Sequence, residues 1–149
     1  MVSARRFERW MRFSAVLYCL GGLGFALMPE MSFALPERAL LTVLGLDWEP
    51  MPRTTVYHWA TLAVSMMATI TICSVLAGRN GQRDRDFAIP VMVSKGVSSV
   101  GALLALGLHG SYAVYLLVFL TDFPLMLLTW WFWSRLRNDL LAWGGYGVR

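Results

Sequence analysis

The chain has 149 residues, of which 57% are hydrophobic and 15% are charged, and its mean hydropathy is +0.55. About a quarter of the residues of a soluble domain are charged, so this composition excludes an ordinary soluble domain. The net charge is +4, but no nucleic-acid-binding motif accompanies it. The spacing of Cys19 and Cys73 fits neither a disulfide framework nor a thiol-redox enzyme.

Long uncharged segments separated by charged ones predict helices that cross a membrane. A bilayer core is spanned by about 20 apolar residues in a helix. The apolar runs predict spans over about residues 11–29, 56–77, 87–108 and 112–133, all within one transmembrane domain of residues 1–149. We therefore expect an all-α integral membrane protein whose fold is a four-transmembrane-helix bundle.

The first apolar run follows four arginines, as a signal peptide also would. It ends in ALMPE at residues 26–30, without a convincing small-x-small cleavage site, so we expect an uncleaved first span. The sequence GGLGFA at residues 21–26 lies within this run. Its small residues allow a neighbouring helix to approach closely.

The segment between the first and second spans contains start and stop signals for a helix. Pro36 suits a first helical turn and Gly45 suits the end. These signals predict a short outer interfacial helix of two to three turns. The alternative is an irregular loop folded over the bundle.

The second span carries a polar stripe with a period of four residues. Its members are Thr61, Ser65, Thr69 and Cys73. Side chains at this spacing share one face of a helix, and we expect that face to turn towards the other helices. There the hydroxyls would bond to neighbouring helices or to their own i−4 carbonyls. The face is either a packing surface of small residues or part of a solvated pathway.

Two charges interrupt the third and fourth spans, namely Lys95 and Asp122. If the chain turns near Gly110, Lys95 lies one helical turn from the level of Asp122, within reach of a lysine side chain. A lone charge at mid-membrane costs about 2.5–3.5 kcal/mol, so an ion pair between the two residues is predicted. Ser99 shares the helix face of Lys95.

These residues define a candidate intramembrane polar site. Its members are Lys95, Asp122, Ser99, Ser65 and Thr69. One interpretation is a structural ion pair that fixes how the helices align. A second is a polar pocket in which Asp122 exchanges a proton or binds a polar ligand head group. In a third, Lys95 extends towards the cytoplasmic interface and Asp122 is neutral.

Two histidines, His58 and His109, are expected at similar depth near the outer leaflet. A pair of imidazoles could ligate haem or a metal, whereas interfacial histidines more often bond to water, head groups or loop backbone. No metal site is completed by neighbouring carboxylates or cysteines. No cofactor is therefore expected, with haem and bound lipid as alternatives, and no catalytic residue is identified.

The arginines indicate the orientation in the membrane. Ten lie before the first span, between the second and third spans or after the fourth, and only Arg38 and Arg53 lie on the other side. By the positive-inside rule, both termini and the loop at residues 79–86 are cytoplasmic. The expected location is the bacterial inner membrane, with multiple passes.

The sequence GGLGFALMPE in the first span is followed, after a short loop, by LLTVLGLD and then by three further spans. In this pattern the chain resembles small four-span bacterial membrane proteins of the DoxX-like type, including related families of unknown function. The resemblance implies a membrane component or an accessory protein. Lys95 and Asp122 are not part of it.

The favoured hypothesis is a non-enzymatic accessory or structural subunit of a larger membrane protein complex. Its partners would be the lipid bilayer and other membrane subunits, or further copies of itself, and not nucleic acid. One alternative is a small carrier or lipophilic-ligand-binding protein that uses the interior around Lys95 and Asp122. The other is a haem- or metal-binding membrane subunit that uses His58 and His109.

Overall fold

The computed structural model describes residues 2–45, 48, 58–109 and 112–144, except for the side chains of residues 58, 109 and 144. All its regular elements are helical. They are α1 (Val2–Leu27), α2 (Met31–Leu44), α3 (His58–Arg79), the 3-10 turn η1 (Arg85–Phe87), α4 (Ala88–His109) and α5 (Ala113–Gly144).

Four helices, α1, α3, α4 and α5, are long and apolar enough to cross a membrane, which confirms the four long apolar helices expected from the sequence. Two of them extend beyond the expected spans. Helix α1 already begins at Val2, so it includes the four arginines that precede the first apolar run, and α5 continues to Gly144. In lipid, a helix is favoured for such runs because it bonds its own backbone N–H and C=O groups.

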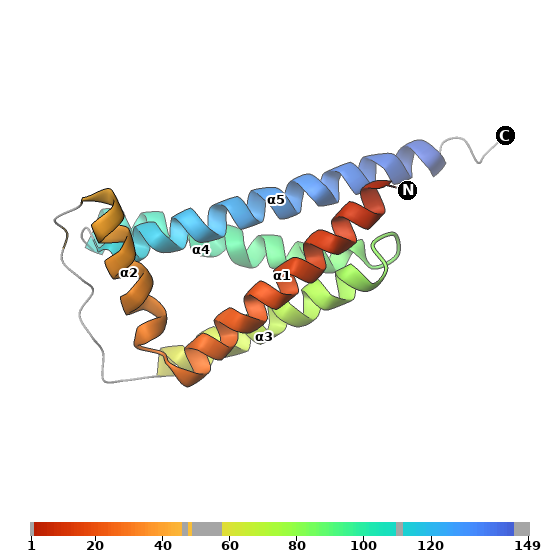
Figure 1. Ribbon diagram of the computed structural model, residues 1–149. Coiled ribbons are helices and arrows are strands. Elements are labelled where there is room, and N and C mark those ends of the chain that lie inside the picture. The colour runs from red at the N-terminus through yellow and green to blue at the C-terminus, as the bar shows by residue number, and fades with distance from the viewer. Residues whose placement is uncertain (1, 46–47, 49–57, 110–111, 145–149) are drawn as a thin grey trace.

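The four long helices form two closely packed antiparallel pairs, α1 with α3 and α4 with α5 (Figure 1). The pairs meet through contacts of α1 with α5 and of α3 with α4. We call the end formed by the first turns of α1, the α3–α4 connection and the last turns of α5 the arginine end. In Figure 1 the pairs lie close together there and diverge towards the opposite end.

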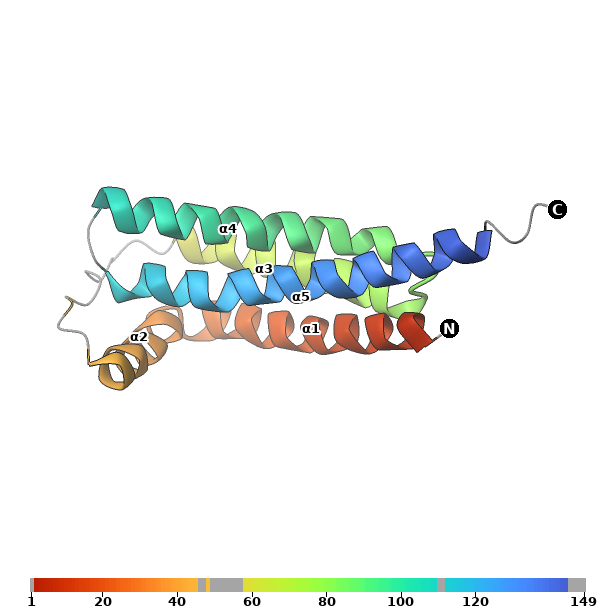
Figure 2. The same ribbon diagram turned by 90° about the horizontal axis from the view of Figure 1, so that it is seen from above.

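Helix α2 lies across the bundle at the end opposite the arginine end, where it packs against α5 and α1 (Figures 1 and 2). Phe33 of α2 packs between Phe25 of α1 and Trp59 of α3, with ring centroids 5.1 and 5.5 Å away. Aromatic pairs at such distances contribute about 0.5–1.5 kcal/mol beyond their buried area. This cluster ties α2 to the first helix pair.

A helix between the first two spans is confirmed, and so is its end at Gly45, but its 14 residues form nearly four turns instead of the two to three expected. Gly45 has φ 62°, a left-handed conformation that glycine adopts without strain, and its N–H donates to the carbonyl of Leu41. The expected start at Pro36 is wrong. The backbone of Glu30 is already helical and its carbonyl accepts the N–H of Ala34, so the helix begins at Met31 and contains Pro36.

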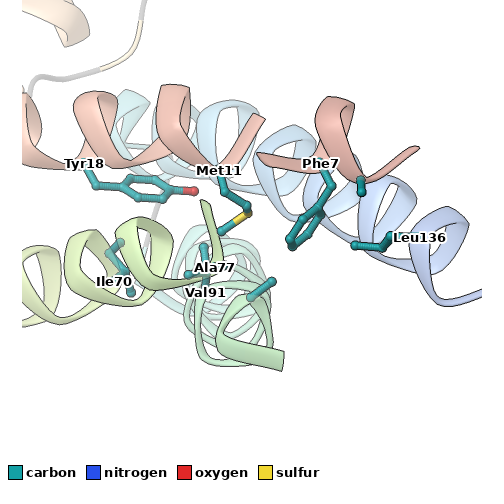
Figure 3. Packing of buried hydrophobic residues seen from close by; sticks show 9 residues of the cluster. Phe7, Met11, Tyr18, Ile70, Ala77, Val91 and Leu136 are labelled. Atoms are coloured by element: carbon teal, nitrogen blue, oxygen red, sulfur yellow. The ribbon is translucent and has the colours of Figure 1, made fainter. Parts of the chain in front are cut away.

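A cluster of buried hydrophobic residues lies in the half of the bundle nearer the arginine end (Figure 3). Phe7 and Met11 of α1 and Leu136 of α5 are fully buried, and Tyr18 and Ile70 close the cluster towards the middle. Large apolar side chains at 0% exposure each contribute about 1.5–3 kcal/mol relative to water. The arginine end is therefore the firmly packed end of the molecule.

Gly78, near the end of α3, and Gly81, just after the helix, allow this end to lie directly on α1. Arg12 Nε donates to the carbonyl of Gly78 at 3.0 Å, and Gly81 N donates to Glu8 Oε1 at 3.0 Å. A Cβ atom on Gly81 would lie 2.9 Å from Cδ1 of Phe7, whose ring is fully buried. The close approach therefore requires a residue without a side chain at position 81.

Replacement of this glycine tests the contact. We expect Gly81→Ala to lower the unfolding free energy by about 1–3 kcal/mol, because the methyl group must displace a packed ring. Gly101→Ala is the control, since a Cβ atom there meets nothing within 4 Å. Unfolding by titration with sodium dodecyl sulfate measures both variants. Equal stability of the two variants would contradict the tight contact.

Candidate intramembrane polar site

The centre of the candidate site is an ion pair between α4 and α5. Lys95 Nζ lies 2.9 Å from Asp122 Oδ1, and the two side chains are 3% and 14% exposed. The ion pair predicted from the sequence is thus present in the structure. It forms because the antiparallel helices place the two residues one turn apart, a distance that the lysine side chain covers.

Serines of α4 complete the hydrogen bonding around the pair. The hydroxyl of Ser98 donates to the second carboxylate oxygen of Asp122, so each oxygen of Asp122 has a partner. Ser99 Oγ donates to the carbonyl of Lys95 at 2.7 Å and is 2% exposed. Hydrogen bonds to an ionised group are about twice as strong as neutral ones. Ser98 therefore helps to hold the carboxylate of Asp122 in place, whereas Ser99 bonds the backbone of α4.

Helix α1 contributes an aromatic ring to the lysine. Lys95 Nζ lies 5.0 Å from the ring centroid of Tyr18, which is 2% exposed. A cation above such a ring gains about 2 kcal/mol or more when both are removed from water. Figure 3 shows the ring beside α3, with its hydroxyl directed towards Met11. Tyr18 thereby links the α4–α5 ion pair to the other helix pair.

Several hydroxyl groups near this level have no hydrogen-bond partner among the described residues. They belong to Ser14 and Tyr18 of α1, Ser74 of α3 and Ser94 of α4. Ser14 and Ser74 are 0% exposed. Buried polar groups are normally satisfied by protein or by ordered water. These four hydroxyls are therefore the groups to which water or a polar ligand group would bond if it entered the interior beside the ion pair.

Two residues assigned to the site from the sequence lie elsewhere. Ser65 and Thr69 are on the exposed face of α3, so the expectation that this stripe turns inward is wrong for them. Thr69 Oγ1 donates to the carbonyl of Ser65 at 2.9 Å. Because a hydroxyl bonded to its own helix needs no other partner, the polar stripe is not forced into the interior. The inner face of α3 instead carries Ile70, Ser74 and Ala77.

The histidines lie at the helix ends opposite the arginine end, with His58 at the start of α3 and His109 at the end of α4. Their side chains are outside the described residues, so ligation of haem or a metal by this pair stays a prediction. Within the described residues, no group of three or more His, Cys, Asp or Glu side chains could hold a metal ion.

Sequence reasoning missed the roles of Ser98 and Tyr18. A signal existed for Ser98, which lies three residues after Lys95 and so shares its helix face. For Tyr18 the sequence shows only a polar position four residues after Ser14 on a span that is otherwise apolar. Its proximity to Lys95 depends on how two helices pack, which helical periodicity does not reveal.

Comparison with protein-family models, curated proteins and solved structures gives no match. The resemblance to DoxX-like proteins therefore stays a prediction. The class that the structure itself defines is an all-helical bundle with four helices long enough to cross a membrane and a buried charge pair among them.

Removal of one charge tests the coupling between the two residues. We expect Lys95→Met and Asp122→Asn each to lower the unfolding free energy by about 3–5 kcal/mol, because each leaves an uncompensated buried charge. The loss of unfolding free energy in the double variant should be much smaller than the sum of the losses in the two single variants. A double-mutant cycle from unfolding titrations measures the difference.

Thr69→Val on the exposed face of α3 is the matched control, with an expected change within about 0.5 kcal/mol. Additive losses in the double variant would show that the two charges are not coupled. In that case the pair would not hold α4 against α5.

Proposed function

We propose that the chain is a multi-pass protein of the bacterial inner membrane, with both termini in the cytoplasm. Its four long apolar helices support insertion. So do the many large apolar side chains exposed on every long helix, such as Val16 at 60%, Leu62 at 69% and Leu104 at 58%, because a soluble bundle would bury them. The ten arginines towards one end support the orientation.

Within the membrane, we propose that the protein is a non-catalytic accessory or structural subunit of a larger complex, as the DoxX-like resemblance also implies. The observation that carries this proposal is the hydroxyl stripe of α3, formed by Thr61, Ser65 and Thr69, which faces away from the chain's own core. Small and hydroxyl-bearing residues on a membrane helix favour packing against another helix. The stripe therefore suits a helix of a second subunit or a second copy of this chain.

The ion pair supports the same proposal. The charges of Lys95 and Asp122 neutralise each other, and both carboxylate oxygens are hydrogen-bonded inside the chain. A pair with this arrangement holds helices in place without needing a substrate. A rigid bundle with a polar outer stripe is what a structural subunit requires.

Purification in a mild detergent tests this function. We expect the wild-type protein to co-purify with a stoichiometric membrane partner or as an oligomer, detected by mass spectrometry. Ser65→Leu should reduce the recovered assembly by about fivefold or more, since overpacking an interface costs about 1–3 kcal/mol.

Val97→Leu is the matched control, because Val97 is an exposed residue of α4, away from the stripe, at 67% exposure. It should leave the assembly intact. A stable wild-type monomer without a co-purifying partner would contradict the accessory role.

A second candidate function is a small carrier or lipophilic-ligand binder, and the buried hydroxyls without partners favour it. Tyr18, whose ring lies beside Lys95, and Ser14 and Ser74 would line a hydrated path from Asp122 towards the arginine end. Along such a path, the carboxylate of Asp122 would exchange a proton or hold a polar head group.

Proton flux into vesicles separates the two functions. For a carrier, the reconstituted protein should acidify pyranine-loaded liposomes under a pH gradient, and Asp122→Asn should abolish the flux because an amide does not carry the proton. Thr69→Val, on the exposed face of α3, should leave it unchanged. Flux equal to that of protein-free liposomes would exclude the proton-carrier version of this candidate.

A further inference from the structure

A pocket of about 190 Å³ lies at the arginine end, between the first turns of α1 and the last turns of α5. It is many times larger than the roughly 15 Å³ that a single water needs. Its lining includes Ser3, Arg6, Trp131, Phe132, Arg135 and Asp139. The pocket is separate from the Lys95–Asp122 site, which lies in the middle of the bundle.

The arginines of this pocket are available to bind an anion. Arg6 and Arg135 come from different helices, and in the part of the chain that the structure describes neither forms an ion pair with a carboxylate. The guanidinium carbon of Arg135 lies 4.6 Å from the ring of Trp131. Stacking on an aromatic ring orients a guanidinium while its N–H groups remain free to bind phosphate.

The start of α1 adds further hydrogen-bond donors. Its first turn contains no acidic residue, so no carboxylate of that turn compensates the positive end of the helix. The hydroxyl oxygen of Ser3 is buried in this region and has no hydrogen-bond partner among the described residues. Helix N-termini with free N–H groups bind phosphate groups well.

In the membrane orientation proposed above, helix packing places this pocket at the level of lipid head groups. Arg12 contacts Gly78 near the end of α3, and Trp10 Nε1 donates to Thr129 Oγ1 at 3.0 Å. Arg6 and Arg135 therefore lie more than a turn beyond the level at which α3 ends. Tryptophans such as Trp131 concentrate at the membrane–water interface.

We propose that this pocket binds the head group of an anionic phospholipid, with the phosphate held by Arg6 and Arg135. Asp139 repels a second negative charge and can accept a hydrogen bond from a hydroxyl, so a glycerol head group fits better than a phosphate monoester. The acyl chains lie along the exposed apolar surface that includes Phe13, which is 59% exposed. The ring of Phe13 packs on Trp10, which stacks on Phe132 of the pocket lining. This inference depends on the insertion proposed above, but not on the role of a subunit or carrier.

Native mass spectrometry of the full chain in a non-ionic detergent tests the site. In titrations with phosphatidylglycerol and phosphatidylcholine, we expect a bound phosphatidylglycerol at concentrations at which phosphatidylcholine does not bind. Arg6→Gln and Arg135→Gln should each weaken phosphatidylglycerol binding about fivefold, and the double variant about 25-fold, since each basic residue contributes about 1 kcal/mol.

Arg137→Gln is the matched control, because it removes the same charge from α5 but lies outside the pocket lining, over the ring of Trp133. The affinity of Arg137→Gln for phosphatidylglycerol should stay within twofold of that of the wild type. An equal loss in Arg137→Gln would overturn the proposal, because general surface charge would then explain the binding. Circular dichroism of each variant must show the helix content of the wild type. If Arg135→Gln does not fold, Arg135→Lys takes its place. This variant keeps the charge and should retain most of the phosphatidylglycerol binding.

Inorganic phosphate distinguishes a lipid site from a site for free phosphate. We expect phosphate to leave the bound phosphatidylglycerol in place at equimolar concentration, because it gains nothing from the apolar surface. Binding of phosphate that depends on Arg6 and Arg135, without preference between the two lipids, would overturn the assignment to lipid. Carbonate extraction of membranes separately tests insertion, so a failure of that assumption is recognised independently.

Discussion

Two opposite charges placed within apolar helices must neutralise each other, and this requirement determines how α4 and α5 lie together. Lys95 and Asp122 come from separate helices and meet at 2.9 Å. Shifting one helix by a turn along the other would separate them and leave two buried charges without compensation, at a cost of several kcal/mol. Because Tyr18 of α1 packs on the lysine, the same constraint extends to the second helix pair.

The rest of the bundle can be understood from this constraint and from the packing at the arginine end. Phe7, Met11 and Leu136 fill the space between the helix pairs there. Glycines bring the end of α3 onto α1 close to this core. Towards the opposite end the pairs diverge, and α2 lies across that end (Figure 1). The molecule thus has a closely packed end, a charged centre and an end at which the helix pairs diverge and a short helix lies across them.

The polar groups of this chain lie in three different environments. The ion pair is satisfied inside the chain, whereas the hydroxyls of α3 such as Thr69 bond their own helix on its outer face. Arg6 of α1 and Arg135 of α5 line a pocket at the arginine end. A polar residue in a membrane helix therefore does not by itself indicate an interior site. What it does depends on which neighbouring group satisfies its hydrogen bonds.

The sequence by itself determined the four long apolar helices, the end of α2 at Gly45 and the reach of Lys95 to Asp122. Each of these follows from local properties, namely the length of an apolar run, the ability of glycine to adopt a positive φ and the rise per residue of a helix. Only the tertiary structure decided that Ser65 and Thr69 face outward, that Tyr18 covers Lys95 and that Arg6 lies near Arg135. The reason is that periodicity shows which residues share a face of a helix, but packing between helices selects the face that turns inward.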